Sequence, residues 1–309
     1  MALQKEQWIK DIEKNLYANN QFMAYGKNDS SYVNFKTVHL PQAGTRPTVE
    51  KDRAILPASI EQRTDTDLTY NLSEYSTAPR LINRNDDVQY LSYNKRMDIM
   101  GDEIAALGDA VANHTLYAWA ATAAARQVRT TGGTTGNLVH STATGTRKLC
   151  IQADIQNARR ILDAQNLGSG RIFMVVPSDM FWNDLMSIST LTKYLEFGKS
   201  VLPTGDLPQV LGMNIIIRSG VSIYDNTATP VRKALSADGS IVTAATSDNN
   251  SILVFHESYV RKALGDIKVY EEMDSPIYYG DIISSQVFHG AAKARTNGEG
   301  IVQIIQTVG

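Results

Sequence analysis

Cysteine is nearly absent from this chain, since Cys150 is the only one among 309 residues. A single cysteine cannot form a disulfide within the chain, and it excludes a metal site built from several cysteines. No apolar run approaches the roughly 20 residues that a membrane-spanning helix needs. Residues 1–20 also lack the apolar stretch of a signal peptide. We therefore expect a protein that is made and kept in a cytosol-like compartment, without a membrane partner.

An excess of charge of either sign is also missing, since 30 basic and 32 acidic residues give a net charge of −2. A protein that coats a nucleic-acid backbone needs a basic surface, so this balance argues against that role. The hydrophobic content of 43% is ordinary and allows a sizeable core. A chain of this length forms one large domain or two lobes.

Patterns typical of catalysis, cofactors or metals are missing too. Gly168 and Gly170 precede an expected strand, whereas phosphate-binding glycines follow a strand and open a helix. No serine lies in a nucleophile-elbow pattern, and no histidine has a second ligand at metal-binding spacing. We expect no catalytic, cofactor-binding or metal-binding residues. We interpret His114 as a hydrogen-bonded core histidine and Cys150 as a small buried hydrophobe.

The most prominent feature that is present is the stretch from Asp86 to about Arg126, which we expect to form one long, nearly unbroken helix. Spacings of three and four place its apolar and small residues on one face: Met97, Met100, Ile104, Leu107, Val111, Ala118 and Ala121. The charged residues are expected to face solvent or a polar neighbour: Lys95, Arg96, Asp98, Asp102, Glu103 and Asp109. Asp86 and Asp87 lie at the expected N-terminus, where the helix dipole favours negative charge. If residues 94–122 are helical throughout, that part alone is about 40 Å long. Such a helix is a strut, although a long helix packed on a sheet fits many mixed folds.

Two strand-like runs, residues 32–40 and 68–72, enclose a long connection over residues 41–67. Leu68, Tyr70 and Leu72 alternate with polar residues, as in a half-exposed strand. A connection of this length exceeds a compact hairpin loop. Residues 31–80 contain six bases and six acids. Such mixed charge suits an arm that reaches another subunit, and it equally suits a solvated surface hairpin.

An amphipathic helix is expected over residues 4–17, with Trp8 and Leu16 on its apolar side. A helix this short is marginal alone in water. We therefore expect its apolar face to dock on the body of the chain or on a neighbouring subunit.

The second half of the chain alternates helices and strands. The spacing predicts helices over 151–167 and from Pro177 to about 188. It predicts strands over 171–176, 215–217, 252–255 and 267–271. Asn297-Gly298 lies between the strand-like runs 281–294 and 301–308, and this pair predicts a closing antiparallel hairpin.

This order of parts resembles the major capsid proteins of tailed bacteriophages, which have the Hong Kong 97 type fold. Four degenerate patterns carry the resemblance over nearly the whole chain. They are Pro79-Arg-Leu-Ile-Asn-Arg-Asn-Asp-Asp87, Met174-Val-Val-Pro177 within the series 154–185, residues 205–212 leading into Ile215–Ile217 and Ser219, and Val254-Phe-His256 with Ala263.

The resemblance implies an α+β fold with four named parts. Residues 1–31 would be an N-arm and residues 32–82 an extended β-hairpin, the E-loop. Residues 83–145, with the spine helix, and the return strands of 257–309 would form the P-domain. Residues 146–256 would form the A-domain. Some members carry a scaffolding segment, for which this chain has no room. Others cross-link a lysine to an asparagine, which we do not predict here, although Lys36 and Lys51 lie in the E-loop.

The implied function is self-assembly, through pentamers and hexamers, into an icosahedral shell that encloses the phage genome. The expected assembly contacts are Trp8, Leu16, Arg46, Lys51 and Arg53. Expected partners are copies of the chain itself, portal and scaffolding or decoration proteins, and weakly contacted double-stranded DNA, with no cofactor. The expected location is the virion, after assembly in the host cytoplasm. Two alternatives remain open: an encapsulin-like nanocompartment shell, and a soluble α+β enzyme or binding protein.

Overall fold

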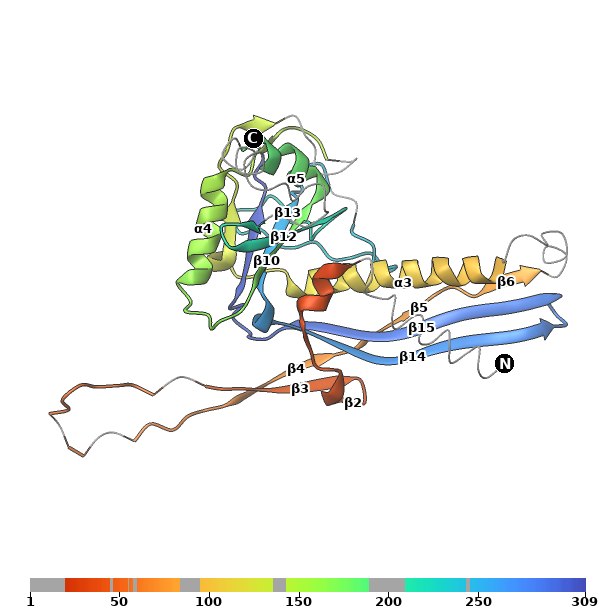
Figure 1. Ribbon diagram of the computed structural model, residues 1–309, viewed down its shortest axis with the longest axis horizontal. Coiled ribbons are helices and arrows are strands. Elements are labelled where there is room, and N and C mark those ends of the chain that lie inside the picture. Colours follow the sequence, from red (N-terminus) through yellow and green to blue (C-terminus); the bar gives the residue numbers. More distant parts are fainter. Residues whose placement is uncertain are drawn as a thin grey trace.

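The computed structural model describes residues 20–44, 47–54, 56–57, 60–83, 95–135, 143–188, 209–242 and 245–309. The expected Asp86, Asp87 and the helix over 4–17 lie outside these ranges. The chain is α+β, with a rounded lobe, an elongated part of long strands, and a loop that extends far from both (Figure 1). In the described ranges, no helix is long and apolar enough to cross a membrane.

The lobe is built on a six-stranded sheet. Its strands in spatial order are β11 (Gln209–Val210), β12 (Met213–Arg218), β10 (Ile172–Pro177), β13 (Ser251–His256), β16 (Ile301–Ile305) and β7 (Gln127–Arg129). β10 runs parallel to β12 and antiparallel to β13. Every residue of β10 and β13 is buried. Strands covered on both faces are apolar almost throughout, which is why these runs could be predicted.

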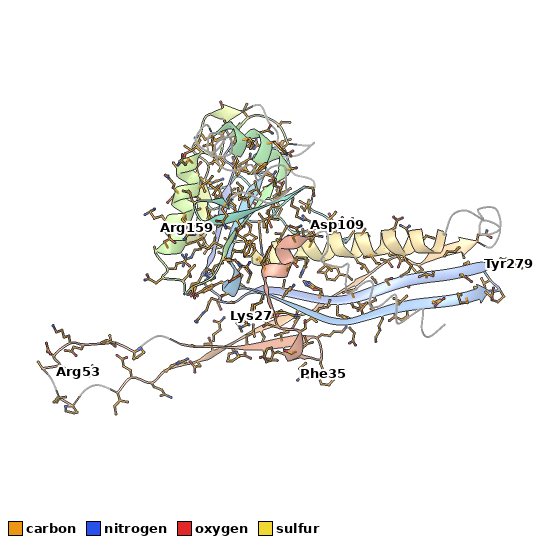
Figure 2. The ribbon with its side chains drawn as sticks, in the orientation of Figure 1. Lys27, Phe35, Arg53, Asp109, Arg159 and Tyr279 are labelled. Carbon is orange, nitrogen blue, oxygen red and sulfur yellow. The ribbon has the colours of Figure 1, made fainter. Side chains whose placement is uncertain are left out.

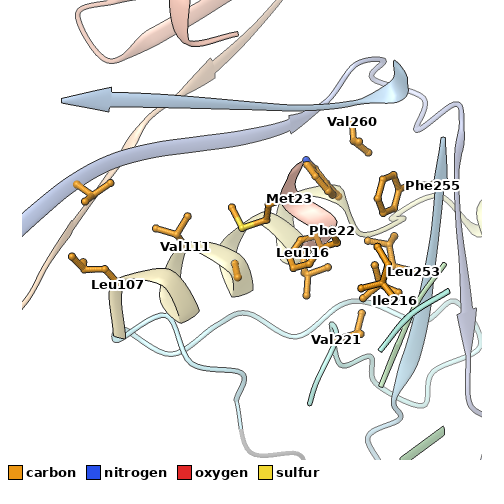
Figure 3. Close-up of a cluster of buried hydrophobic side chains, with 14 of the residues drawn as sticks. Phe22, Met23, Leu107, Val111, Leu116, Ile216, Val221, Leu253, Phe255 and Val260 are labelled. Atoms are coloured by element: carbon orange, nitrogen blue, oxygen red, sulfur yellow. The ribbon is translucent and has the colours of Figure 1, made fainter. Parts of the chain in front are cut away.

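Side chains alternate between the two faces of this sheet, so each face has its own core. On one face, Met174 and Val254 belong to a cluster with Ile155 and Leu162 of α4 (Gln152–Asp163). The short helices α5 (Ser178–Asn183) and η4 (Leu185–Ser187) add to that cluster. On the other face, the ring of Phe255 lies 5.2 Å from that of Trp119, centroid to centroid, within the cluster of Figure 3.

The elongated part contains the longest described strands, β14 (Val260–Ser275) and β15 (Gly280–Lys293), which pair antiparallel. The other edge of β15 pairs with β5 (Ser73–Ser76) and β6 (Arg80–Asn83), and β1 (Lys27–Asn28) pairs with β14. β15 therefore lies between β14 on one edge and β5 and β6, which precede the long helix in the chain, on the other.

The long helix α3 (Lys95–Trp119) lies along this second sheet and ends at the lobe (Figure 1). Leu107 and Val111 of the helix share one buried cluster with Ile283 and Val287 of β15. Near the end of α3, Leu116 joins the same cluster, and the Trp119 Nε1–H donates to the backbone oxygen of Arg261 at 2.9 Å. The helix thus ties the elongated part to the lobe through one continuous core.

The extended loop begins at a three-stranded sheet of β2 (Val33–Asn34), β3 (Thr37–Gln42) and β4 (Thr66–Asn71). β3 and β4 pair over six positions, from Thr37 with Asn71 to Gln42 with Thr66. The predicted single run over 32–40 is divided, because Phe35 and Lys36 adopt positive φ angles of 54° and 100° and turn β2 back onto β3. The alternation of Leu68, Tyr70 and Leu72 is confirmed as a half-exposed strand that continues into a buried residue.

Short elements complete the described chain. They are η1 (Gln21–Tyr25), η2 (Ser30–Tyr32), η3 (Ala124–Arg126), η6 (Glu257–Tyr259), and the pair β8 (Thr134–Thr135) and β9 (Arg147–Lys148). β8 and β9 pair antiparallel, Thr134 with Lys148 and Thr135 with Arg147.

The long-helix prediction is confirmed over residues 95–119, which form α3, but the helix ends at Trp119 rather than near the expected Arg126. Of the charged side chains of this helix that the structure describes, one departs from the expected pattern. Glu103 was assigned to the face away from the core, yet it is 2% exposed and accepts a hydrogen bond from the Ser285 hydroxyl at 2.5 Å. The sheet reaches around the helix farther than the apolar stripe indicates, and Ser285 supplies the polar partner that makes the burial tolerable.

The predicted closing hairpin is wrong. β15 pairs with β14, whereas β16 leaves for the lobe sheet and pairs with β13 and β7. Asn297-Gly298 still makes a tight turn, with Gly298 at a φ of 66°, but the turn links two sheets. The hairpin partner of β15 is reached through the turn 276–279, which contains no Asn-Gly pair.

Candidate assembly surfaces

The tip of the extended loop makes few contacts with the rest of the chain. Every described residue from 47 to 67 is exposed. Among these residues are large apolar side chains that a folded monomer normally shields: Val49 is 92% exposed, Leu56 79% and Ile60 99%. An apolar surface of this kind marks a binding surface or an aggregation hazard.

The two limbs of the loop are held together by local polar contacts. Glu61 accepts hydrogen bonds from the hydroxyl and the backbone N–H of Thr48, at 2.5 and 3.4 Å, and these bonds lower the pKa of Glu61. Asp65 accepts from the Gly44 N–H at 2.8 Å, and this bond, with that from Arg63, lowers the pKa of Asp65. The loop therefore has its own internal order without support from the lobe.

The base of the loop is fixed to the body through a buried ion pair that lies just ahead of it in the chain. Asp29 is fully buried, and its carboxylate lies 2.8 Å from the Arg261 guanidinium of β14. The Tyr70 hydroxyl of β4 donates to the same carboxylate at 3.2 Å. Farther out, Arg295 Nη1 donates to the Ala43 oxygen at 3.1 Å. The base of the loop is thus bonded to the body of the chain, whereas its tip is exposed to solvent.

A second exposed apolar group lies at the opposite end of the molecule, in the turn between β14 and β15. Ile277, Tyr278 and Tyr279 are 75%, 55% and 78% exposed. Figure 2 labels Tyr279 at this end and Arg53 at the tip of the extended loop, at opposite ends of the longest axis. Three adjacent apolar and aromatic residues beside Pro276 were a sequence signal for this surface, and it was missed because the 280s were assigned to a different hairpin.

The predicted contact residues fall into two groups. Trp8, Leu16 and Arg46 lie outside the described residues. Lys51 and Arg53 both lie in the exposed tip, where the Arg53 guanidinium pairs with Glu50 at 3.2 Å. Contact of these residues with another subunit stays a prediction.

Chemistry of other kinds finds little support in the described part of the chain. No group of three or more potential metal-ligating side chains comes together there. Cys150 is buried, as predicted, and burial raises the pKa of its thiol. His114 is only half-buried, and its ring lies edge-on to that of Tyr75, with centroids 5.7 Å apart.

Comparison with known proteins finds similarity in structure rather than in sequence. No family model and no curated protein matches the chain. A chain from the capsid of cyanophage P-SCSP1u is similar with a TM-score of 0.60 and 16% identity, over 91% of this chain and 86% of that one. A chain from the capsid of Ralstonia phage GP4 has a TM-score of 0.60 and 13% identity, over 92% and 87%.

A virus-like particle from Pyrococcus furiosus is also similar, with a TM-score of 0.56 and 8% identity, over 97% of this chain and 99% of that one. Coverage near 90% or above means that the likeness includes the lobe, the long helix and the long strands together. The α+β fold of the Hong Kong 97 type, predicted from the sequence, is confirmed.

Proposed function

We propose, from the fold that this chain shares with chains of phage capsids, that it is a major capsid protein. Copies associate through pentamers and hexamers into an icosahedral shell that encloses a phage genome. The observation that supports this most directly is the extended loop. Its apolar tip is exposed in the single chain, while at its base the Tyr70 hydroxyl donates to the buried Asp29–Arg261 ion pair. A surface of that kind becomes buried only when another chain covers it.

In this proposal the chain has four parts, each with its own place in the shell. Residues 1–31 form the N-arm, 32–82 the E-loop, 83–145 and 257–309 the P-domain, and 146–256 the A-domain that packs around the symmetry axes. In this division β7 and β16 belong by sequence to the P-domain, although they complete the lobe sheet. A closed shell needs one sequence to make non-identical contacts, and a rigid lobe with a projecting loop meets that need.

The energy of association must come mainly from buried apolar area. An exposed ion pair such as Arg53–Glu50 contributes only about 0–1 kcal/mol. Apolar surface contributes roughly 25 cal/mol for each Å² removed from water. Val49, Leu56 and Ile60 therefore matter more to affinity than the charges around them, which contribute to correct orientation.

The wider setting follows from the same proposal. The chain serves the virion as a structural protein rather than an enzyme, after assembly in the host cytoplasm. Portal and scaffolding or decoration proteins are its further partners. The net charge of −2 suits an inner wall that contacts packaged double-stranded DNA only weakly. An encapsulin-like shell is the alternative, and the contents of purified particles, nucleic acid or cargo protein, separate the two.

The test removes the tip of the loop and keeps its base. Gln42 and Thr66 are the last paired residues of β3 and β4, so residues 43–65 are replaced by Asn-Gly, which closes a two-residue hairpin. We expect a chain with unchanged circular dichroism that forms monomers or capsomers but no shells in size-exclusion chromatography and electron microscopy. The control carries a Gly/Ser segment of the original length. Normal shells from the shortened chain would refute the proposal.

A further inference from the structure

A pocket of about 390 Å³ lies where the base of the extended loop meets the end of α3 and the end of β15. The loop base contributes Leu68, Asn71 and Ser73 to its lining, and α3 contributes His114, Tyr117 and Ala118. Its basic side chains come from three segments of the chain, and they are His114, Arg232, Lys293 and Arg295. Its described lining contains no acidic residue, although the whole chain carries a net charge of −2.

Arg232 is held in place by uncharged groups. Its guanidinium carbon lies 3.9 Å from the centroid of the Tyr117 ring, and its Nη1 donates to the Tyr117 backbone oxygen. That oxygen belongs to the last turn of α3, where the helix dipole favours a cation. Stacking and this hydrogen bond fix the guanidinium plane while leaving its charge without a carboxylate among these contacts.

Lys293 is oriented in the same way. Its Nζ donates to the Thr122 hydroxyl at 3.1 Å, which is again a neutral acceptor. Burial, and then the charge of Arg232, lowers the pKa of Lys293 to about 8. The charged form of Lys293 is therefore disfavoured in this half-buried site, and an anion beside it would favour that form.

The remaining two basic residues differ. Arg295 faces the Glu299 carboxylate at 3.9 Å and donates to the Ala43 oxygen, so its charge is already partly balanced. The Nδ1 atom of His114 is buried and has no hydrogen-bond partner among the described residues. Burial, and then Arg232, lowers the pKa of His114, so its ring is neutral at pH 7 and acts there as a hydrogen-bonding group.

We propose that this pocket binds an oxyanion, a phosphate or a carboxylate group, between Arg232 and Lys293. A planar guanidinium donates two parallel hydrogen bonds to such a group, and an ammonium adds a charge-assisted bond. A cavity of this volume accommodates one phosphate or one acidic side chain. A DNA duplex is a poorer fit, since it engages many phosphates along an extended basic face.

The oxyanion has two possible sources, a free ion or an acidic side chain of a second copy of this chain. Both present the same chemistry to the pocket. A free ion binds the dissociated chain and the assembled shell alike, whereas a neighbour's carboxylate leaves the pocket open in the dissociated chain and occupied in the shell.

The experiment titrates inorganic phosphate against the full-length, dissociated chain by calorimetry, at constant ionic strength set with chloride. We expect saturable binding that is at least tenfold weaker in Arg232→Gln and in Lys293→Gln. Lys293→Arg keeps the charge and should retain binding. Lys268→Gln removes an exposed lysine on β14, away from the pocket, and should bind as the unmodified chain does.

Repeating the titration on assembled particles identifies the source. Equal binding by particles points to a free ion, and lost binding by particles points to a neighbour's carboxylate. Saturable phosphate binding that is unchanged in both Arg232→Gln and Lys293→Gln would overturn the proposal. The proposal would also be overturned if the dissociated chain showed no saturable phosphate binding, or if it bound duplex DNA but not phosphate. The titrations of the dissociated chain do not depend on whether it builds a phage shell, whereas the titration of particles rests on the proposed assembly.

Discussion

Buried ionisable side chains make the stability of this chain depend on pH. His289 of β15 is fully buried. Burial, with the nearby charges of His114 and Lys262, lowers the pKa of His289 to about 3. An unfolded chain holds this histidine near its ordinary pKa of about 6.5. The neutral ring therefore stabilises the fold above pH 6.5, and that contribution is lost as the pH falls from 6.5 toward 3.

We expect His289→Gln to remove this pH dependence. At pH 7.5 the variant is less stable than the unmodified chain, because a fitted side chain is lost. At pH 5 the gap should shrink by about 2 kcal/mol, since each pH unit below 6.5 removes about 1.4 kcal/mol from the unmodified chain alone. Urea unfolding of the dissociated chains at the two pH values measures the gap. A gap that stays constant would contradict the assignment.

Elements whose signal is local could be predicted from the sequence. The spacing of Leu107 and Val111 with their neighbours indicated α3, and continuous apolar runs indicated β10 and β13. Strand pairing was harder, because it joins residues far apart in the chain. Asn297-Gly298 predicted a hairpin that the competing partner β13 prevents, since the apolar β16 is buried better in the lobe sheet.

The end of α3 carries the joint between the lobe and the elongated part, so its packing should matter most. Leu116 is 1% exposed within the cluster of Figure 3. We expect Leu116→Ala to lower the free energy of unfolding by about 2–5 kcal/mol, through lost burial and a residual cavity. Leu81→Ala on β6, where the side chain is 43% exposed, is the matched control and should cost far less. Chemical denaturation compares the two, and equal losses would contradict a joint at this place.

At the scale of the whole molecule, one of the two candidate surfaces was predicted from the sequence and the other was not. The extended loop was expected from the length and mixed charge of residues 41–67, and the exposed tip agrees. The turn with Tyr278 and Tyr279 was missed, because a register between distant strands decides which residues form a turn. Contact of Trp8, Leu16 and Arg46 with another subunit stays a prediction.

The Tyr278–Tyr279 turn gives a test that separates folding from assembly. Both side chains are exposed, so replacing both with serine should change the free energy of unfolding by no more than about 0.5 kcal/mol per site. We expect shell formation, followed by light scattering, to fall at least tenfold at equal protein concentration, because the lost apolar surface is repeated in every copy. Unimpaired shells would show that this end of the molecule is a free surface.

Because the loop tip is exposed, its cleavage by trypsin can be used to follow association of the chain. Lys51, Arg53 and Arg63 are exposed sites for trypsin in a segment without a covering layer. We expect the dissociated chain to be nicked there within minutes, and the same sites to be cut at least tenfold more slowly once a neighbour covers them. Mass spectrometry of timed digests follows the change, and equal cutting rates would contradict such covering. The time at which these sites become protected from trypsin would then show when each copy associates with its neighbour.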